Sequence, residues 1–267
     1  MRVSRAETTL NYVILLAFAA FALAPVLTIL TTSVSAPLGE SGGPHLENFA
    51  RAWTVGGFGR SLGNSVVVAA IVVMLATVLS IGSGYAFGTM RFPGSTPLFY
   101  LFLIGMMIPA EATVIPLFFD LRTLGLTDTY AAIALPQVAQ SIAFGTFWLR
   151  AQFRAMPTSL LEAAALDGAG PLRALRSILV PASRPAIVTM LVLVFMWTWN
   201  EFLIALVMTP GGSLRTAPLG LATFQGQYTS ETALLAAGAV IIALPTVILF
   251  LFLQRHFIRG MLEGVAK

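Results

Sequence analysis

Six long apolar stretches, almost free of charged side chains, constrain the fold of this chain more than any other feature. They lie at residues 13–30, 65–87, 98–119, 131–149, 187–208 and 233–253. A helix rises about 1.5 Å per residue, so about 20 residues cross the roughly 30 Å hydrocarbon core of a bilayer. In lipid the backbone must satisfy its own hydrogen bonds, which a helix does within one segment. We therefore predict an all-α integral membrane protein with six transmembrane helices.

The overall composition supports a membrane protein and excludes several other classes. Hydrophobic residues make up 57% of the chain and charged residues 10%, outside the range of soluble domains. The absence of cysteine excludes disulfides, thiol catalysis and thiolate metal sites. The only histidines are His45 and His256, and no Ser-His-Asp arrangement appears, so we expect neither an enzyme nor a cofactor or metal in this chain. No basic cluster is interleaved with aromatic residues, which argues against nucleic acid as a partner.

The first apolar stretch has two interpretations. Arg2 and Arg5 precede it, and Ser33–Ala36 faintly resembles a signal-peptide cleavage site. The stretch is nevertheless longer than the roughly 7 to 15 apolar residues that signal peptides use. We predict a retained membrane anchor rather than a cleaved signal.

The distribution of basic residues predicts the orientation, because cytoplasmic loops are enriched in Lys and Arg. A cytoplasmic N-terminus leaves four basic residues outside, Arg51, Arg60, Arg122 and Arg215. The cytoplasmic segments then hold the other eleven: Arg2, Arg5, Arg91, Arg150, Arg154, Arg173, Arg176, Arg184, Arg255, Arg259 and Lys267. We therefore predict cytoplasmic termini and a cytoplasmic loop 150–184 between the fourth and fifth spans. The loops 31–64, 120–130 and 209–232 would face outward, and residues 1–267 would form one membrane domain.

Residues 159–181 form a polar, helix-forming island within this apolar chain. Ser159 and Glu162 have the spacing of a capping box, which predicts a helix that begins at Ser159 and ends at Gly168. A second short helix is expected from Pro171 to Pro181. Three small alanines and the carboxylates of Glu162 and Asp167 make the first helix suitable for docking against a basic partner. A surface helix lying on the membrane is the alternative.

These residues resemble the EAA loop of ATP-binding-cassette importer permeases, the segment that enters a cleft of the cytosolic ATPase. Further motifs resemble, in the same order, the MalG-type half of carbohydrate importers. They are Arg91-Phe-Pro-Gly94, Gly125-Leu-Thr-Asp-Thr-Tyr130, Trp199-Asn-Glu-Phe202, Leu214-Arg-Thr-Ala-Pro-Leu-Gly-Leu221, Phe224-Gln-Gly-Gln-Tyr228 and Gln254-Arg-His-Phe257. The resemblance covers nearly the whole chain.

The resemblance implies a complex with four kinds of partner: a MalF-like second permease, two copies of an ATPase that binds ATP and Mg, an extracytoplasmic sugar-binding protein, and the lipid bilayer. The residues expected to couple this chain to the ATPase are Glu162, Ala163, Ala164, Asp167 and Gly168. The C-terminal tail would also touch the ATPase through Gln254 and Arg255, although Met261-Leu-Glu263 departs from the small polar residues expected there. The outer loop would face the binding protein through Gly226, Gln227 and Tyr228, unless it is an ordinary ordered loop.

Polar side chains inside the spans are candidates for a substrate path, because such residues are costly in a membrane. The candidates, in the outer half or middle of their spans, are Asn64, Glu111, Gln137, Gln140, Asn200 and Glu201. Hydrogen bonding between helices, or to backbone freed by Pro109 and Pro116, is the structural alternative. The predicted function is a permease subunit of an ATP-driven importer of sugars or sugar derivatives, working by alternating access in the inner (cytoplasmic) membrane.

Two functions of other classes compete with this prediction. An ion-coupled secondary transporter would use Glu111 or Glu201 for protons or sodium, and would be expected to show inverted repeats and midplane charges. The chain shows neither. A polytopic membrane enzyme would need a catalytic constellation, which the sequence does not offer.

Overall fold

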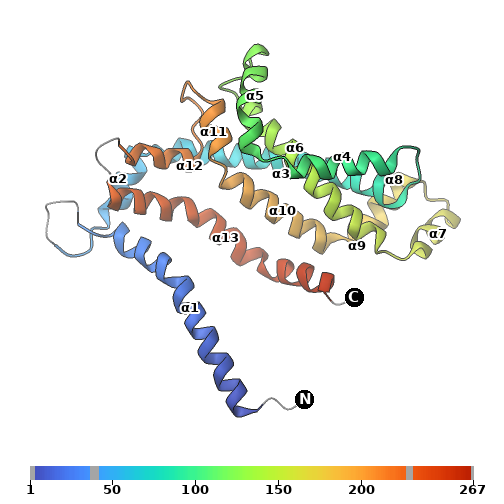
Figure 1. Ribbon diagram of the computed structural model, residues 1–267, viewed down its shortest axis with the longest axis horizontal. Coiled ribbons are helices and arrows are strands. Elements are labelled where there is room, and N and C mark those ends of the chain that lie inside the picture. The colour runs from blue at the N-terminus through green and yellow to red at the C-terminus, as the bar shows by residue number, and fades with distance from the viewer. Residues whose placement is uncertain (1–3, 37–41, 227–230, 266–267) are drawn as a thin grey trace. The chain divides into compact units, whose positions relative to one another are not determined.

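The computed structural model describes residues 4–36, 42–226 and 231–265, and within these ranges it contains helices and no strand. The predicted all-α class is confirmed. In chain order (Figure 1), the α-helices are α1 (Arg5–Ser33), α2 (Glu47–Val55), α3 (Phe58–Thr89), α4 (Ser95–Met107), α5 (Ala110–Thr123), α6 (Tyr130–Arg154), α7 (Thr158–Leu166), α8 (Pro171–Ala174), α9 (Val180–Ala182), α10 (Arg184–Trp199), α11 (Leu203–Met208), α12 (Ala217–Gly220) and α13 (Thr232–Val265). A π-helical turn, Leu175–Leu179, joins α8 to α9, and a 3₁₀ turn, Leu221–Phe224, follows α12.

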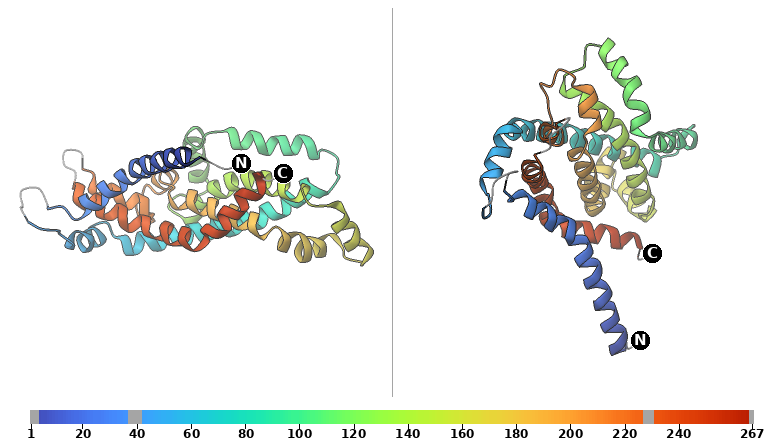
Figure 2. Two further views of the ribbon diagram at one scale, coloured as in Figure 1. Left: turned by 90° about the horizontal axis from the view of Figure 1, so that it is seen from below. Right: turned by 60° about the vertical axis from the view of Figure 1, so that its left-hand side comes forward.

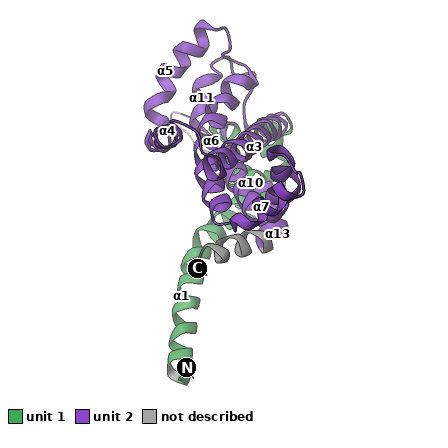
Figure 3. Ribbon diagram, turned by 90° about the vertical axis from the view of Figure 1, so that its right-hand side faces the viewer, with its two compact units in different colours: residues 1–59, 220–244 green, residues 60–219, 245–267 purple. Residues whose placement is uncertain are grey.

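The chain forms two compact units, coloured separately in Figure 3. The first comprises residues 1–59 and 220–244, and the second residues 60–219 and 245–267. In the first unit the buried Asn48 ties α2 to the end of α1, because its Nδ2 donates to the carbonyls of Ser33 (3.1 Å) and Ser35 (2.9 Å). Phe58 packs against Phe224, with ring centroids 6.2 Å apart.

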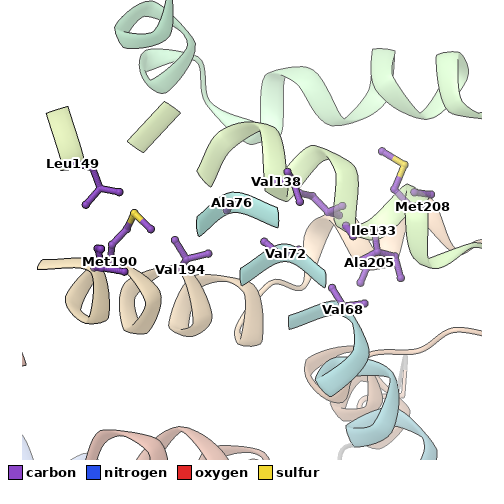
Figure 4. Packing of buried hydrophobic residues seen from close by; sticks show 14 of the residues in the cluster. Val68, Val72, Ala76, Ile133, Val138, Leu149, Met190, Val194, Ala205 and Met208 are labelled. Carbon is purple, nitrogen blue, oxygen red and sulfur yellow. The ribbon is translucent and has the colours of Figure 1, made fainter. Parts of the chain in front are cut away.

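The core of the second unit lies where α3, α6, α10 and α11 meet (Figure 4). Val72, Ile133, Met190, Val194 and Met208 contribute fully buried side chains from these four helices. The helices α3 and α6 approach each other closely at Gly145 of α6. A Cβ on Gly145 would lie 2.6 Å from Cβ of Ser80 on α3. A glycine in the helix therefore lets α3 and α6 pack without a gap.

Four single helices are long and apolar enough to cross a membrane: 7–33, 58–89, 130–154 and 232–254. They coincide with the first, second, fourth and sixth predicted spans. Two bent helix pairs, 95–107 with 110–123 and 171–182 with 184–199, are together also long and apolar enough to cross. The chain therefore has up to six spans if each pair is one span.

The third predicted span, residues 98–119, is not one helix. α4 and α5 meet at an angle of 98°, with Ile108 and Pro109 in extended conformation between them. The reason is local, since a proline ring clashes with the preceding residue when that residue is helical.

The fifth predicted span, residues 187–208, is also interrupted. α10 ends at Trp199 and α11 begins at Leu203. Asn200 Nδ2 donates to the carbonyl of Met196 (2.7 Å), and Glu201 Oε1 accepts from the backbone N–H of Ile204 (2.8 Å). The two polar side chains therefore cap the helix ends on either side of the break. The helices that are together long and apolar enough to cross a membrane in this region are 171–182 and 184–199, which meet at 79°.

The predicted capping box at Ser159 is wrong. α7 begins one residue earlier, after Pro157 with φ −58° and ψ 130°, and no side chain caps it. Ser159 therefore lies within the first turn, past the capping position. The predicted end of the helix is confirmed, because Gly168 has φ +75° and Ala169 N–H donates to the Ala164 carbonyl at 2.8 Å, as in a Schellman motif.

The second short helix of the island extends one residue beyond the prediction, to Ala182, and includes the π-helical turn. In a regular α-helix the ring of Pro181 would clash with the carbonyl four residues earlier, that of Ser177. Ser177 lies inside the π-helical turn, whose wider backbone relieves this clash.

Candidate functional site

The helix α7 lies at one end of the second unit (Figure 1; Figure 2, left) and presents much of its surface to the outside. Glu162, Ala163, Asp167 and Gly168 are exposed. Leu166, 91% exposed, adds an apolar side chain between the carboxylates. A face of this kind, with acidic groups around an uncovered leucine, is suited to a protein partner with a basic and apolar cleft.

Ala164 differs from the other predicted coupling residues. Its side chain is only 4% exposed, and its carbonyl accepts the hydrogen bond from Ala169 that ends the helix. It faces the protein, while Glu162 and Ala163 face outward.

The segment that follows α7, which contains α8 and the π-helical turn, is tied to α3 and α6. Tyr85 of α3 donates its hydroxyl proton to the carbonyl of Pro171 (3.2 Å) and packs edge-on against Phe153 of α6. Leu175 and Leu179 are buried in the core cluster that also holds these two aromatic residues. The segment that follows α7 is therefore packed against α3 and α6.

A second feature is a cavity of about 390 Å³ next to the bend between α4 and α5. The extended Ile108 and Pro109 form part of its wall. Its polar lining comes from α6, the end of α10 and the break that follows α10: Gln137, Gln140, Ser141, Thr198 and Glu201. Phe144 and Trp197 supply aromatic rings, packed edge to face with centroids 4.8 Å apart. A mainly apolar wall with a few polar groups is typical of small-molecule sites.

The structure brings together three of the six residues predicted for a substrate path, Gln137, Gln140 and Glu201. Gln137 and Glu201 each already use one polar atom in a bond to the backbone. Gln137 Nε2 donates to the Ile133 carbonyl (2.9 Å), and Glu201 Oε1 caps α11.

The other three predicted residues do not line this cavity. Asn64 is buried elsewhere in the second unit, between Tyr130 and Arg215. Glu111 is exposed in the first turn of α5, and Asn200 is exposed beside the break after α10.

Sequence reasoning missed the aromatic and hydroxyl members of the cavity. Residues 137, 140, 141 and 144 recur at the spacing of one helix face, a signal visible in the sequence. The contribution of Trp197 and Thr198 has no such signal, because it depends on how α10 packs beside α6.

The other predicted contact residues lie at the edge of the described structure. Gly226 is exposed, whereas Gln227 and Tyr228 lie outside the described residues. Gln254 donates its amide to the Leu251 carbonyl (3.0 Å), and the side chains from Arg255 onward also lie outside the description. Both sets of contacts stay predictions. Within the described ranges no group of three or more His, Asp or Glu side chains could hold a metal ion.

Comparison with known proteins gives a consistent set of matches. Residues 79–263 match the family model of the binding-protein-dependent transport system inner membrane component. The trehalose transport system permease protein SugB of Mycobacterium tuberculosis is 36% identical over 212 residues, 79% of this chain and 77% of the relative. The arabinooligosaccharides transport system permease protein AraQ of Halalkalibacterium halodurans is 36% identical over 223 residues, 83% of this chain and 79% of the relative.

The fold is similar to that of a solved chain from a bacterial ABC transporter involved in the import of the acidic polysaccharide alginate. The TM-score is 0.81 at 23% sequence identity, and the alignment covers 96% of this chain and 99% of that one.

Proposed function

The chain belongs to the family of binding-protein-dependent transport system inner membrane components, and on this premise we propose that it is a permease subunit of an ATP-driven importer of sugars or sugar derivatives. The substrate class is supported by the names of relatives 36% identical to this chain, which transport trehalose and arabinooligosaccharides. The family consists of membrane transport components rather than enzymes, and this chain has four candidate spans, or up to six if each bent helix pair is one span.

The proposed topology has six spans in the inner membrane, with both termini and the loop 150–184 in the cytoplasm. Four single helices would supply four of the spans, and the bent pair α4–α5 and the helix α10, which begins where the loop 150–184 ends, would supply the other two. The imbalance of eleven basic residues against four supports this orientation. We take residues 1–267 as one functional membrane domain, whose compact units both contain parts of spanning helices.

The observation that carries the proposal is the exposed, anchored helix α7. Glu162, Ala163 and Leu166 would enter the cleft of a partner ATPase, and Asp167 and Gly168 would complete the contact at the end of the helix. The ATPase, present in two copies, would hold ATP and Mg, and this chain would hold no cofactor. Closure of the ATPases would then displace α7 and, through Tyr85 and Phe153, the spanning helices.

The cavity near Pro109 is the proposed part of the substrate path in this chain. Its volume of about 390 Å³ falls within the roughly 300 to 1,000 Å³ of typical small-molecule sites. Amide and hydroxyl groups can both donate to and accept from sugar hydroxyls, and a carboxylate can accept from them. A MalF-like second permease would complete the path, and a sugar-binding protein would deliver the substrate to residues 214–228 of the outer loop.

The ion-coupled alternative has little support. Glu111 is exposed rather than enclosed, and one oxygen of Glu201 is engaged by the backbone of α11. Membership of a binding-protein-dependent transport family favours coupling to an ATPase instead.

The proposal is tested by reconstituting the complete transporter with its binding protein and measuring ATP hydrolysis with a panel of sugars. Stimulation by one sugar identifies the substrate. Glu162→Lys should abolish ligand-stimulated hydrolysis or assembly with the ATPase, because it places a cation against the basic residue expected in the cleft.

Asp120→Lys is the matched control, since Asp120 is also an exposed acidic residue but lies near the end of α5, on the opposite predicted side of the membrane. Normal assembly and transport by Glu162→Lys would contradict the coupling role of this residue. A lack of stimulation by every sugar, with intact assembly, would contradict the substrate class.

A further inference from the structure

A second cavity, of about 500 Å³, lies where α3 and α6 end and α4 begins. Three arginines line it: Arg91 in the α3–α4 connection, and Arg150 and Arg154 in the last turns of α6. Ser95, Thr96 and Thr158, whose side chains carry hydroxyl groups, line the same cavity. Its lining is thus cationic and rich in hydrogen-bond donors, unlike that of the cavity assigned to the substrate path.

The three arginines have no carboxylate partner among the residues that the structure describes, where the one ion pair within 4.0 Å joins His45 and Glu47. Arg150 Nε donates to the Phe87 carbonyl (3.2 Å), and its guanidinium lies 3.8 Å above the ring of Phe99. Arg150 and Arg154 are four residues apart on one helix, where like charges destabilise each other. An anion in this cavity would relieve that repulsion.

The beginning of α4 adds a further attraction for an anion. α4 has 13 residues, and its N-cap, Gly94, provides no side-chain hydrogen bond to the free N–H groups of the first turn. Ser95 and Thr96 of that turn line the cavity. The positive end of a helix dipole therefore acts on the same space as the three guanidinium groups.

The surface that leads away from the cavity is apolar. Leu98, Tyr100 and Leu101 of α4 are 46%, 59% and 62% exposed. Phe87 packs against Phe92, Phe99 and Phe102, which gives the cavity an aromatic edge. An anion bound here would thus carry an apolar portion that lies along α4.

We propose that this cavity binds the phosphodiester headgroup of an anionic phospholipid. Arg91 and Arg154 would contact the phosphate oxygens, since guanidinium groups bind phosphate through two parallel hydrogen bonds. The acyl chains would lie along the exposed side chains of α4. Basic pockets between spanning helices on the cytoplasmic side suit such headgroups. A carboxylate of a partner protein would match the charge but would leave the apolar strip uncovered.

The site adjoins the proposed coupling helix. Thr158 and Leu161 of α7 are part of the cavity wall, so a bound lipid would touch the base of that helix. The inference rests on the proposed membrane topology, which places the cavity at the level of the cytoplasmic headgroups, but it requires neither sugar nor ATP.

The test is lipid retention by the complete transporter, purified in detergent and titrated with phosphatidylglycerol or phosphatidylcholine while bound lipids are counted by native mass spectrometry. The wild-type complex should prefer phosphatidylglycerol. Arg91→Gln with Arg154→Gln should weaken that preference at least about tenfold, because two charge-assisted hydrogen-bonding groups are lost. Both arginines are exposed, so the double variant should still assemble.

Arg60→Gln with Arg122→Gln is the matched control, since it removes two exposed arginines far along the chain from the cavity and should leave lipid retention unchanged. Equal lipid binding by the cavity variant and the wild type would overturn the proposal. Displacement of the lipid by millimolar inorganic phosphate would also overturn it, as it would identify a site for a soluble anion. Loss of ATPase assembly with unchanged lipid retention would instead identify a protein interface.

A second measurement applies if the double variant does not assemble. Phosphatidylglycerol with a photoreactive headgroup, added to the wild-type complex, should crosslink to peptides that contain residues 88–96 or 150–158. Crosslinks confined to other segments would contradict the site. A failure of the sugar-stimulated hydrolysis assay would leave this result untouched, so the two proposals fail separately.

Discussion

Asn64 uses both ends of its side-chain amide within the protein. Its Nδ2 donates to the Arg215 carbonyl (3.0 Å), and its Oδ1 accepts from the Tyr130 hydroxyl (2.8 Å). The residue is only 6% exposed and links α3, the beginning of α6 and the loop before α12. This arrangement favours the structural interpretation of Asn64 over a role in the substrate path.

Asn64→Ala should therefore destabilise the protein, by about 1–3 kcal/mol, because the hydroxyl of Tyr130 and the carbonyl of Arg215 lose their partner. Thermal unfolding of the purified complex measures the loss. Asn200→Ala serves as control, since Asn200 is exposed and its side-chain amide donates to the Met196 carbonyl in its own helix end, and should have a smaller effect. A changed KM for the transported sugar, without a lower Tm, would instead support a path-lining role for Asn64.

The sequence predicts only some of the residues that line the cavity near Pro109. The face formed by Gln137, Gln140 and Phe144 follows from helical spacing alone. Glu201 and Asn200 were equal candidates in the sequence, yet only Glu201 lines the cavity. Their roles depend on the three-residue break between α10 and α11, which neither residue signals by itself.

At the scale of helices, the position of a proline does not by itself predict where a helix breaks. Pro109 separates α4 from α5, whereas Pro25, Pro116, Pro136 and Pro245 all lie inside helices. A spanning helix tolerates a proline when neighbouring groups satisfy the freed carbonyl. These five prolines are the ones that lie within the predicted spans, so the sequence identifies five places where a spanning helix could break. The packing around each proline decides whether the helix breaks there.

The two ends of α7 differ in predictability for a related reason. Gly168 ends the helix because a left-handed conformation is a local property that glycine supplies. The beginning depends on how the chain arrives from α6 through Pro157, and this moved the first turn away from the predicted capping box. The glycine predicted the end of α7 correctly because its effect is local, whereas the capping box failed because the beginning of α7 also depends on the preceding segment.

The well-defined end of α7 leads to a prediction about coupling. Gly168→Ala should weaken the helix end by about 1–2 kcal/mol, since an alanine is strained at φ +75°. A nine-residue helix has little stability of its own, so the coupling helix should fray and ligand-stimulated ATP hydrolysis should fall severalfold. The measurement is ATPase activity of the reconstituted complex.

Gly170→Ala is the control for this change, because Gly170 has φ −67° and a Cβ there would meet no atom within 4 Å. It should retain activity. Gly168→Asn should be intermediate, since asparagine tolerates the left-handed region better than alanine. Equal activity of Gly168→Ala and Gly170→Ala would show that coupling does not need an ordered end of α7.

At the scale of the whole molecule, the orientation in the membrane connects the proposals. The proposed orientation rests on the distribution of 15 basic residues, a property of the whole chain that no single helix carries. The proposed orientation puts both α7 and the arginine-lined cavity at the cytoplasmic side. An inverted orientation would separate α7 from any cytosolic ATPase.

The orientation can be tested directly because the chain contains no cysteine, so a single introduced thiol reports one position. Leu166→Cys in α7 and Leu124→Cys after α5 replace the same residue type at sites that are 91% and 70% exposed, so their thiols should react comparably in water. A membrane-impermeant maleimide should label the Leu124→Cys variant in intact spheroplasts and the Leu166→Cys variant only in inside-out vesicles. Addition of the ATPase should then protect the Leu166→Cys thiol. Labelling with the opposite sidedness would place α7 outside the cell and remove the basis for coupling through this helix.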